Sequence, residues 1–171
     1  MGGLLRFGHT GLDAFLPQRG VGDGELVVAD LRSGFQTEKA YLEALGMGVS
    51  NAARSVGRPV AVLCATRPPA RMTDMLTMQN LSRDEGILID GRRPVASLLA
   101  ALYAHQLTTP LAMVVVDELE SLGSPAPPRG FTAEQLLAAR AATLGSFAAM
   151  AGVPVVIGCR SLAGTATARA G

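Results

Sequence analysis

The sequence lacks a strong net charge of either sign. Its 171 residues include 15 Lys and Arg against 14 Asp and Glu. This balance excludes a broad basic surface for nucleic acid, so any contact with DNA would have to be local. Hydrophobic residues make up 49% and charged residues 17%, which excludes a disordered chain. The length suits one domain with a buried core, and we expect a single domain over 1–171 with flexible ends at 1–10 and 163–171.

Long apolar runs are also missing. The richest apolar stretch is interrupted by His105, Gln106, Thr108 and Thr109, well short of the ~18 residues that cross a bilayer. The N-terminus, MGGLLRFGHTG, has no apolar core followed by a small-residue cleavage site. We therefore predict a cytoplasmic protein without membrane contact.

Cysteine and histidine are scarce and scattered. Cys64 and Cys159 lie far apart, and neither they nor His9 and His105 have neighbours at metal-ligand spacing. We expect the two cysteines to be small buried residues at strand ends. No zinc site and no catalytic dyad is predicted.

Short valine-rich runs are present, and they alternate with longer segments of helical periodicity. Runs without strict alternation of polar residues are typical of buried parallel strands. Thr132, with Glu134 and Gln135 after it, is a helix-start signal, whereas the prolines of 124–130 favour a surface loop. We predict strands at 25–29, 59–64, 113–117 and 153–159, a short fifth strand at 86–90, and helices at 37–55, 69–80, 94–106 and 132–151.

This alternation predicts an α/β fold with a parallel sheet covered on both faces. In open sheets of this kind, binding sites form at the carboxyl ends of the strands. The segments to inspect for function are therefore 30–37, 64–68, 117–124 and 158–162.

Residues 25–45, ELVVADLRSGFQTEKAYLEAL, have the order of a phosphate-binding loop: strand, glycine-containing turn, helix. Such a loop reads G-x-x-x-x-G-K-[ST], because glycines let backbone N–H groups surround phosphate and the lysine adds charge. In DLRSGFQT, Asp30 and Phe35 stand at the glycine positions, Gln36 stands at the lysine, and only Thr37 matches. The pattern is a coincidence, an unusual working site or the remnant of one.

Several segments, taken in order, resemble the RecA-like ATPase core (the ASCE type), and more closely the motor domain of DnaB-type replicative helicases. The order and spacing match over about residues 8–162. The resemblance implies a RecA-like three-layer sandwich with a mostly parallel central sheet, in which strand 153–159 lies between strands 25–29 and 113–117. An unrelated doubly wound domain is the alternative. The matching segments are HTGLDAFLP, GVGDGELVV, GRPVAVLCATRPPARMTDML, GILIDGRRPVASLLAAL, LAMVVVDELESL and AATLGSFAAMAGVPVVIGCRSL.

The resemblance also implies roles for single residues, and most of the family's chemistry is missing. Thr66 stands where the family has its water-activating glutamate, and Arg160 where it has the γ-phosphate-sensing glutamine. Asp117 matches the Walker B aspartate that orients Mg²⁺, and Glu118 follows it. The vestigial nucleotide site would then consist of Ser33, Gly34, Gln36, Thr37 and Asp117.

Loss confined to the chemistry predicts a pseudo-ATPase without a cofactor. Its expected role is a structural or regulatory subunit in DNA replication, recombination or repair, assembled with itself or with a RecA/DnaB-like partner protein. The expected contact surfaces are the apolar segment Met72 to Leu81 and the proline-rich loop 122–131. Phe35 is expected to pack against apolar neighbours and to fill the space of a phosphate.

Two other functions stay open. An active NTPase would bind ATP and Mg²⁺, with Glu118 as catalytic base and with Thr37 and Asp117 holding the metal. A contributory DNA-binding role is the other, although arginines scattered on a neutral chain are more often solvated. Its candidate contacts are Arg67, Arg71, Arg92, Arg93 and Arg129.

Overall fold

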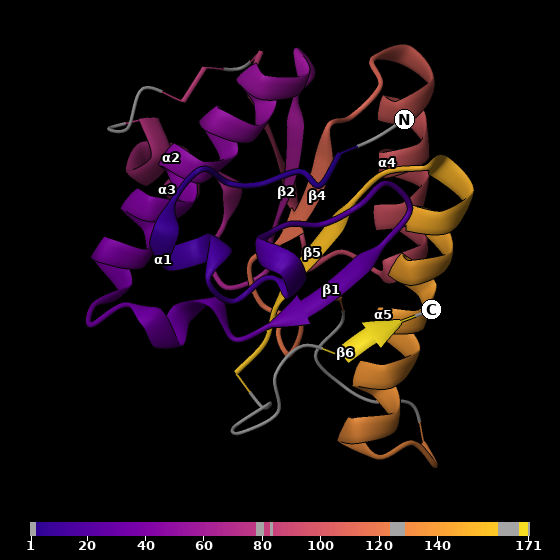
Figure 1. The fold of residues 1–171 in the computed structure, drawn as a ribbon. Helices are drawn as coiled ribbons and strands as arrows, with labels where there is room; N and C mark the ends of the chain where they lie inside the picture. Colours follow the sequence, from indigo (N-terminus) through magenta and orange to yellow (C-terminus); the bar gives the residue numbers. More distant parts are fainter. Residues whose placement is uncertain (1–2, 78–80, 83, 124–128, 161–167, 171) are drawn as a thin grey trace.

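The computed structural model describes residues 3–77, 81–82, 84–123, 129–160 and 168–170. A twisted sheet runs through the centre, with α1–α3 on one face and α4 and α5 on the other (Figure 1). Along the chain, the elements are α1 (Thr10–Asp13), η1 (Pro17–Arg19), β1 (Leu26–Ala29), η2 (Leu31–Gly34), α2 (Glu38–Val56), β2 (Val60–Cys64), α3 (Pro69–Thr77), β3 (Gly86–Asp90), α4 (Val95–Thr108), β4 (Met113–Val116), α5 (Ala133–Ala151), β5 (Val155–Gly158) and β6 (Ala168–Ala170).

The sheet has the strand order β3-β2-β4-β5-β1-β6, and β1 to β5 are parallel. Strand β5 lies between β1 and β4, which confirms the expected order. Within this ladder, Val155 is paired with Leu26 on one side and with Val114 on the other. The three-layer α/β architecture is therefore as expected.

The strands are buried on both faces, which explains their unbroken valine runs. In β1, Val27 and Ala29 belong to the core beneath α1, α2 and α3, while Leu26 and Val28 belong to the core beneath α4 and α5. Alternate side chains point to opposite faces of a strand, so each strand contributes to two cores.

The helices begin and end near the expected residues. Thr37 caps α2 by accepting from the N–H of Ala40 at 3.1 Å. Thr132 and Gln135 form a reciprocal capping box at the start of α5, which confirms the helix-start signal. The expected helix 69–80 is described as far as Thr77, and residues 124–128 of the expected loop lie outside the described part.

Both chain ends contain residues that pair with the rest of the fold. Phe7 is fully buried, and Leu5 pairs with Val21 in an antiparallel bridge. Asp13 binds the segment to α1, because its carboxylate accepts from the N–H groups of Phe7 (2.8 Å) and Gly8 (3.0 Å). At the other end, Ala168–Ala170 form β6, antiparallel to β1. The segments expected to be flexible therefore include residues that contact the rest of the fold, and their flexibility stays a prediction.

The expected contact surface at Met72 to Leu81 is also wrong where the structure describes it. Met72 and Leu76 are completely buried, and Leu81 packs against the same core. Met72 and Leu76 therefore serve to pack α3 on the sheet. Cys64 and Cys159 are both buried, as expected. No helix in the described part of the chain is long and apolar enough to cross a membrane.

Gly158 provides a test of how tightly the strand ends are packed. A Cβ at this position would lie 2.6 Å from the carbonyl oxygen of Asp117. Because that contact is with backbone, we expect Gly158→Ala to lower the free energy of unfolding by about 1–3 kcal/mol in urea denaturation. The matched control is Gly3→Ala, where nothing lies within 4 Å of the added carbon. Equal stability of the two variants would contradict this packing.

Candidate functional site

The candidate site lies at the carboxyl ends of β1, β4 and β5, where the degenerate loop was predicted. After β1 the chain forms the short 3₁₀ turn η2 and reaches Phe35 in an extended conformation. The turn is closed from within, because the N–H of Phe35 donates to the carbonyl of Arg32 (3.0 Å) and the hydroxyl of Ser33 donates to that of Asp30 (3.0 Å). Thr37 follows as the N-cap of α2. The N–H of Phe35 and the hydroxyl of Ser33, which lie where a working loop would face phosphate, are thus engaged within the turn.

Phe35 packs as expected, but it leaves a hollow open. Its ring centroid lies 5.8 Å from those of His9 and Tyr41, and the side chain rests against the core. A hollow of about 360 Å³, here called the loop hollow, remains beside the ring, so Phe35 does not fill the space completely. It is lined by Asp30, Arg32, Ser33, Phe35, Gln36, Thr37, Glu38, Tyr41 and Arg160.

Asp117 is buried at the end of β4 and is held by the chain that follows β2. Its carboxylate accepts from the N–H of Ala65 (2.8 Å), the N–H of Thr66 (3.1 Å) and the hydroxyl of Thr66 (2.7 Å). Burial raises the pKa of this carboxyl, and the donated hydrogen bonds lower it in part. Thr66 stands where the catalytic base was expected. It therefore donates hydrogen bonds to Asp117, the residue that was expected to orient the metal.

Glu118 is held by two arginines. Its Oε1 lies 3.2 Å from Nη1 of Arg32 and 2.6 Å from Nε of Arg160, and its Oε2 accepts from the hydroxyl of Ser121. Only 8% of its side chain is exposed. A general base needs a free lone pair directed at the attacking water. In this structure both oxygens of Glu118 already have internal partners.

Arg32 is the important residue that our sequence analysis missed. It lies inside the loop, 12% exposed, and it contacts Glu118 and, at 3.2 Å, Glu38. Its guanidinium also stands 5.0 Å from the ring centroid of Tyr41. A signal was available, because Arg32 is the one Lys or Arg within DLRSGFQT. The search had looked for a cation at the lysine position only.

Charge in the loop hollow is balanced. Its lining contains two arginines, Arg32 and Arg160, and two acids, Asp30 and Glu38, so the formal charges sum to zero. A nucleotide triphosphate is bound in working loops by excess positive charge. Lys39 does not supply that excess, because its side chain is 76% exposed and pairs with Glu43 along α2.

Two titratable side chains near the site, Cys64 and Tyr41, are kept neutral by burial. Burial raises the pKa of the Cys64 thiol to about 12, and the charges of Asp117 and Asp90 act in the same direction. Burial also raises the pKa of Tyr41, against the opposing effect of Arg32.

No group of three or more His, Cys, Asp and Glu side chains in the described ranges is arranged to hold a metal ion.

The arginines proposed to contact DNA do not form one free cluster. Arg67 lies 4.0 Å from Glu38, and Arg92 donates to the carbonyls of Ala65 (3.2 Å) and Thr66 (3.0 Å). Arg71, Arg93 and Arg129 are exposed, on α3, after β3 and before α5. Two of the five thus support the loops at the carboxyl edge.

Comparison with known proteins identifies the fold. No protein-family model matches the chain, and no curated protein is significantly similar in sequence. Among solved structures, the crystal structure of the KaiC-like protein PH0186 from the hyperthermophilic archaeon Pyrococcus horikoshii OT3 is similar, with a TM-score of 0.64 and 13% identity. The match covers 97% of this chain and 74% of that chain. The similarity shows a RecA-like fold, and at this identity it shows the fold alone.

The buried ion pair between Arg32 and Glu118 should couple more strongly than an exposed pair. In double-mutant cycles with Arg32→Gln and Glu118→Gln, we expect a coupling free energy of about 1.5–3 kcal/mol, because both side chains are largely withdrawn from water. The matched control is Lys39→Gln with Glu43→Gln, an exposed pair 3.9 Å apart that should give about 0.3–0.5 kcal/mol. Equal coupling free energies in the two cycles, measured by urea denaturation, would show that the Arg32–Glu118 ion pair does not stabilise the loop more than an exposed pair would.

Proposed function

We propose that this protein is a non-catalytic RecA-like domain, a pseudo-ATPase that works as a structural or regulatory subunit. The observation that carries the proposal is the engagement of both candidate catalytic carboxylates. Asp117 is held by Ala65 and Thr66, and Glu118 is held by Arg32 and Arg160. Catalysis would require breaking these contacts in a site whose lining has no excess positive charge.

The process that this subunit serves is proposed from the sequence resemblance. The segments that match in order and spacing over about residues 8–162 resemble DnaB-type motors, and this resemblance favours DNA replication, recombination or repair. The exposed arginines Arg71, Arg93 and Arg129 would contribute weakly to DNA binding. Partner assembly is the main role in this proposal, and DNA contact is secondary.

Mg-ATP should neither bind nor be hydrolysed. We expect no heat in calorimetric titration, no phosphate release, and no change in melting temperature with excess Mg-ATP. A ligand present at about 100 times its dissociation constant would raise the free energy of unfolding by about 2.7 kcal/mol, which such a measurement detects readily.

The control separates binding from catalysis. Asp117→Ala and Glu118→Gln remove the metal-orienting and base candidates of the alternative NTPase. Micromolar affinity of the unaltered protein, or turnover that either substitution abolishes, would replace the pseudo-ATPase by an active NTPase with an atypical loop.

The outer face of α4 and α5 is the surface we propose for association with a second copy. Helix α4 contains no Asp, Glu, Lys or Arg, and neither does α5 after Arg140. Leu107 is 87% exposed and Met150 is 79% exposed. They lie at the same end of the helix pair, because the hydroxyl of Tyr103, one turn before Leu107, contacts Sδ of Met150 at 3.8 Å. An uncharged apolar face is complementary to itself, so two copies can bury it without desolvating a charge.

Sedimentation should show self-association at tens of micromolar. We expect the double substitution Leu107→Glu and Met150→Glu to abolish it, because two copies would then bring like charges together. Lys39→Glu, on exposed α2 surface, is the control and should associate like the unaltered protein. A strict monomer, or association unaffected by the double substitution, would contradict this surface.

A further inference from the structure

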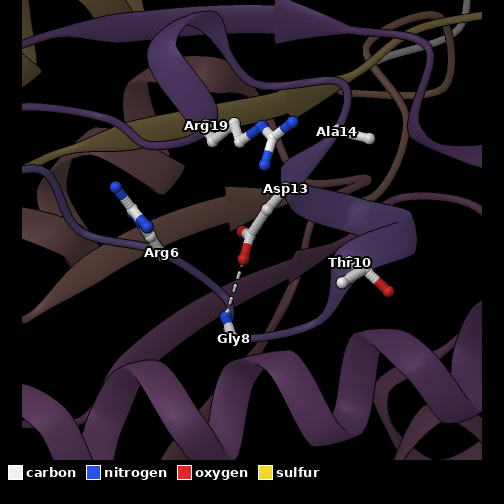
Figure 2. A pocket seen from close by; sticks show the side chains of 6 residues that line it. All are labelled: Arg6, Gly8, Thr10, Asp13, Ala14 and Arg19. Carbon is white, nitrogen blue, oxygen red and sulfur yellow. Dashed lines mark hydrogen bonds between the residues drawn. The ribbon is translucent and has the colours of Figure 1, made fainter.

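A second hollow, which shares no lining residue with the loop hollow, lies near the N-terminus. It has a volume of about 570 Å³ and is bordered by the segment before α1, by α1 itself and by η1 (Figure 2). We call it the N-terminal hollow, and its lining residues are Arg6, Gly8, Thr10, Asp13, Ala14 and Arg19. Volumes of this size are usual for small-molecule sites, which run from about 300 to 1,000 Å³.

Two exposed arginines border this hollow without partners. Among the residues that the structure describes, neither Arg6 nor Arg19 has an ion pair or a side-chain hydrogen bond. This differs from the loop hollow, where Arg32 and Arg160 both form ion pairs with Glu118. The guanidinium donors of Arg6 and Arg19 are therefore available to a ligand.

The one acid in the lining is already engaged. Asp13 is 9% exposed, and each of its oxygens accepts from a backbone N–H, one from Phe7 and one from Gly8. Figure 2 shows its carboxylate turned towards Gly8, with Arg19 on the opposite side of the residue. Two arginines and one aspartate leave a net formal charge of +1. The hollow therefore favours an anion.

The backbone that carries Arg19 is held in an uncommon conformation. Gln18 and Arg19 have φ values of 53° and 57°, in the left-handed region that non-glycine residues rarely adopt. The turn is fixed by hydrogen bonds from the N–H of Arg19 to Leu16 and from that of Gly20 to Pro17. This conformation sets the direction in which the Arg19 side chain leaves the chain, at the border of the hollow.

We propose that the N-terminal hollow binds the phosphoryl group of a small molecule. Arginine presents several N–H donors in one plane, which suits the oxygens of phosphate, and Thr10 adds an exposed hydroxyl to the lining. A nucleic-acid strand is disfavoured, because it would need cations along a track, whereas these two arginines border a single hollow. This site is independent of the degenerate loop and of the pseudo-ATPase proposal.

Pyrophosphate, titrated in the absence of Mg²⁺ at constant ionic strength, is the probe. Calorimetry should show binding to the full chain, and Arg6→Gln or Arg19→Gln should each weaken it about tenfold or more, since each removes a charge-assisted contact. The matched control is Arg71→Gln, which removes the same charge from an exposed position on α3 and should leave the affinity unchanged. Absence of binding, or equal weakening by Arg71→Gln, would overturn the proposal.

Two further measurements test whether the anion binds at this hollow and whether the ligand is a small molecule. Arg32→Gln alters only the loop hollow and should not affect pyrophosphate affinity; loss of binding in that variant would place the anion at the degenerate loop and overturn this site. An oligonucleotide without terminal phosphates should not compete with pyrophosphate. Competition by the oligonucleotide in the unaltered protein would overturn the small-molecule ligand in favour of backbone phosphates.

Discussion

The buried carboxylate of Asp117 is the interaction on which the carboxyl edge of the sheet depends. A charge with 1% exposure has to be satisfied internally, and Asp117 accepts three hydrogen bonds from Ala65 and Thr66. These bonds join the end of β4 to the turn after β2. Glu118, the next residue, then extends the connection to the loop after β1 through Arg32. Residues with the positions of a catalytic pair thus act as structural links between three strand ends.

Charge balance accounts for the contrast between the two hollows. At the loop hollow, acids and arginines neutralise one another within the protein, so a polyanion would have to displace Glu118 or Glu38 from arginines that they already contact. At the N-terminal hollow, Asp13 is occupied by backbone N–H groups instead, and neither Arg6 nor Arg19 pairs with an acid in the described part of the chain. The arginines at the loop hollow are therefore engaged by acids, whereas those at the N-terminal hollow are available to an anionic ligand.

The two helix layers differ in how they meet solvent. On the α1–α3 face, the N-terminal segment covers part of the layer, with Phe7 fully buried. On the opposite face, α4 and α5 pack on each other through Tyr103 and Phe147, whose rings meet edge to face at 5.0 Å. Helix α4 and the part of α5 after Arg140 contain no Asp, Glu, Lys or Arg, and Leu107 and Met150 are exposed there. The difference is the physical basis for placing self-association on this side.

By itself, the sequence determined the five parallel strands and the helix starts at Thr37 and Thr132, because periodicity and capping are local signals. The position of β5 between β1 and β4 followed from the resemblance to RecA-like cores. The sequence also showed that Phe35 and Gln36 break the phosphate-loop pattern. Only the tertiary structure decided that Met72 is core and that Arg32 meets Glu118, 86 residues away in the chain. It also decided that Phe7 is buried in the core and that Ala168–Ala170 pair with β1. Those outcomes depend on which surfaces meet after folding, and pairing between distant segments leaves no periodic trace in either one.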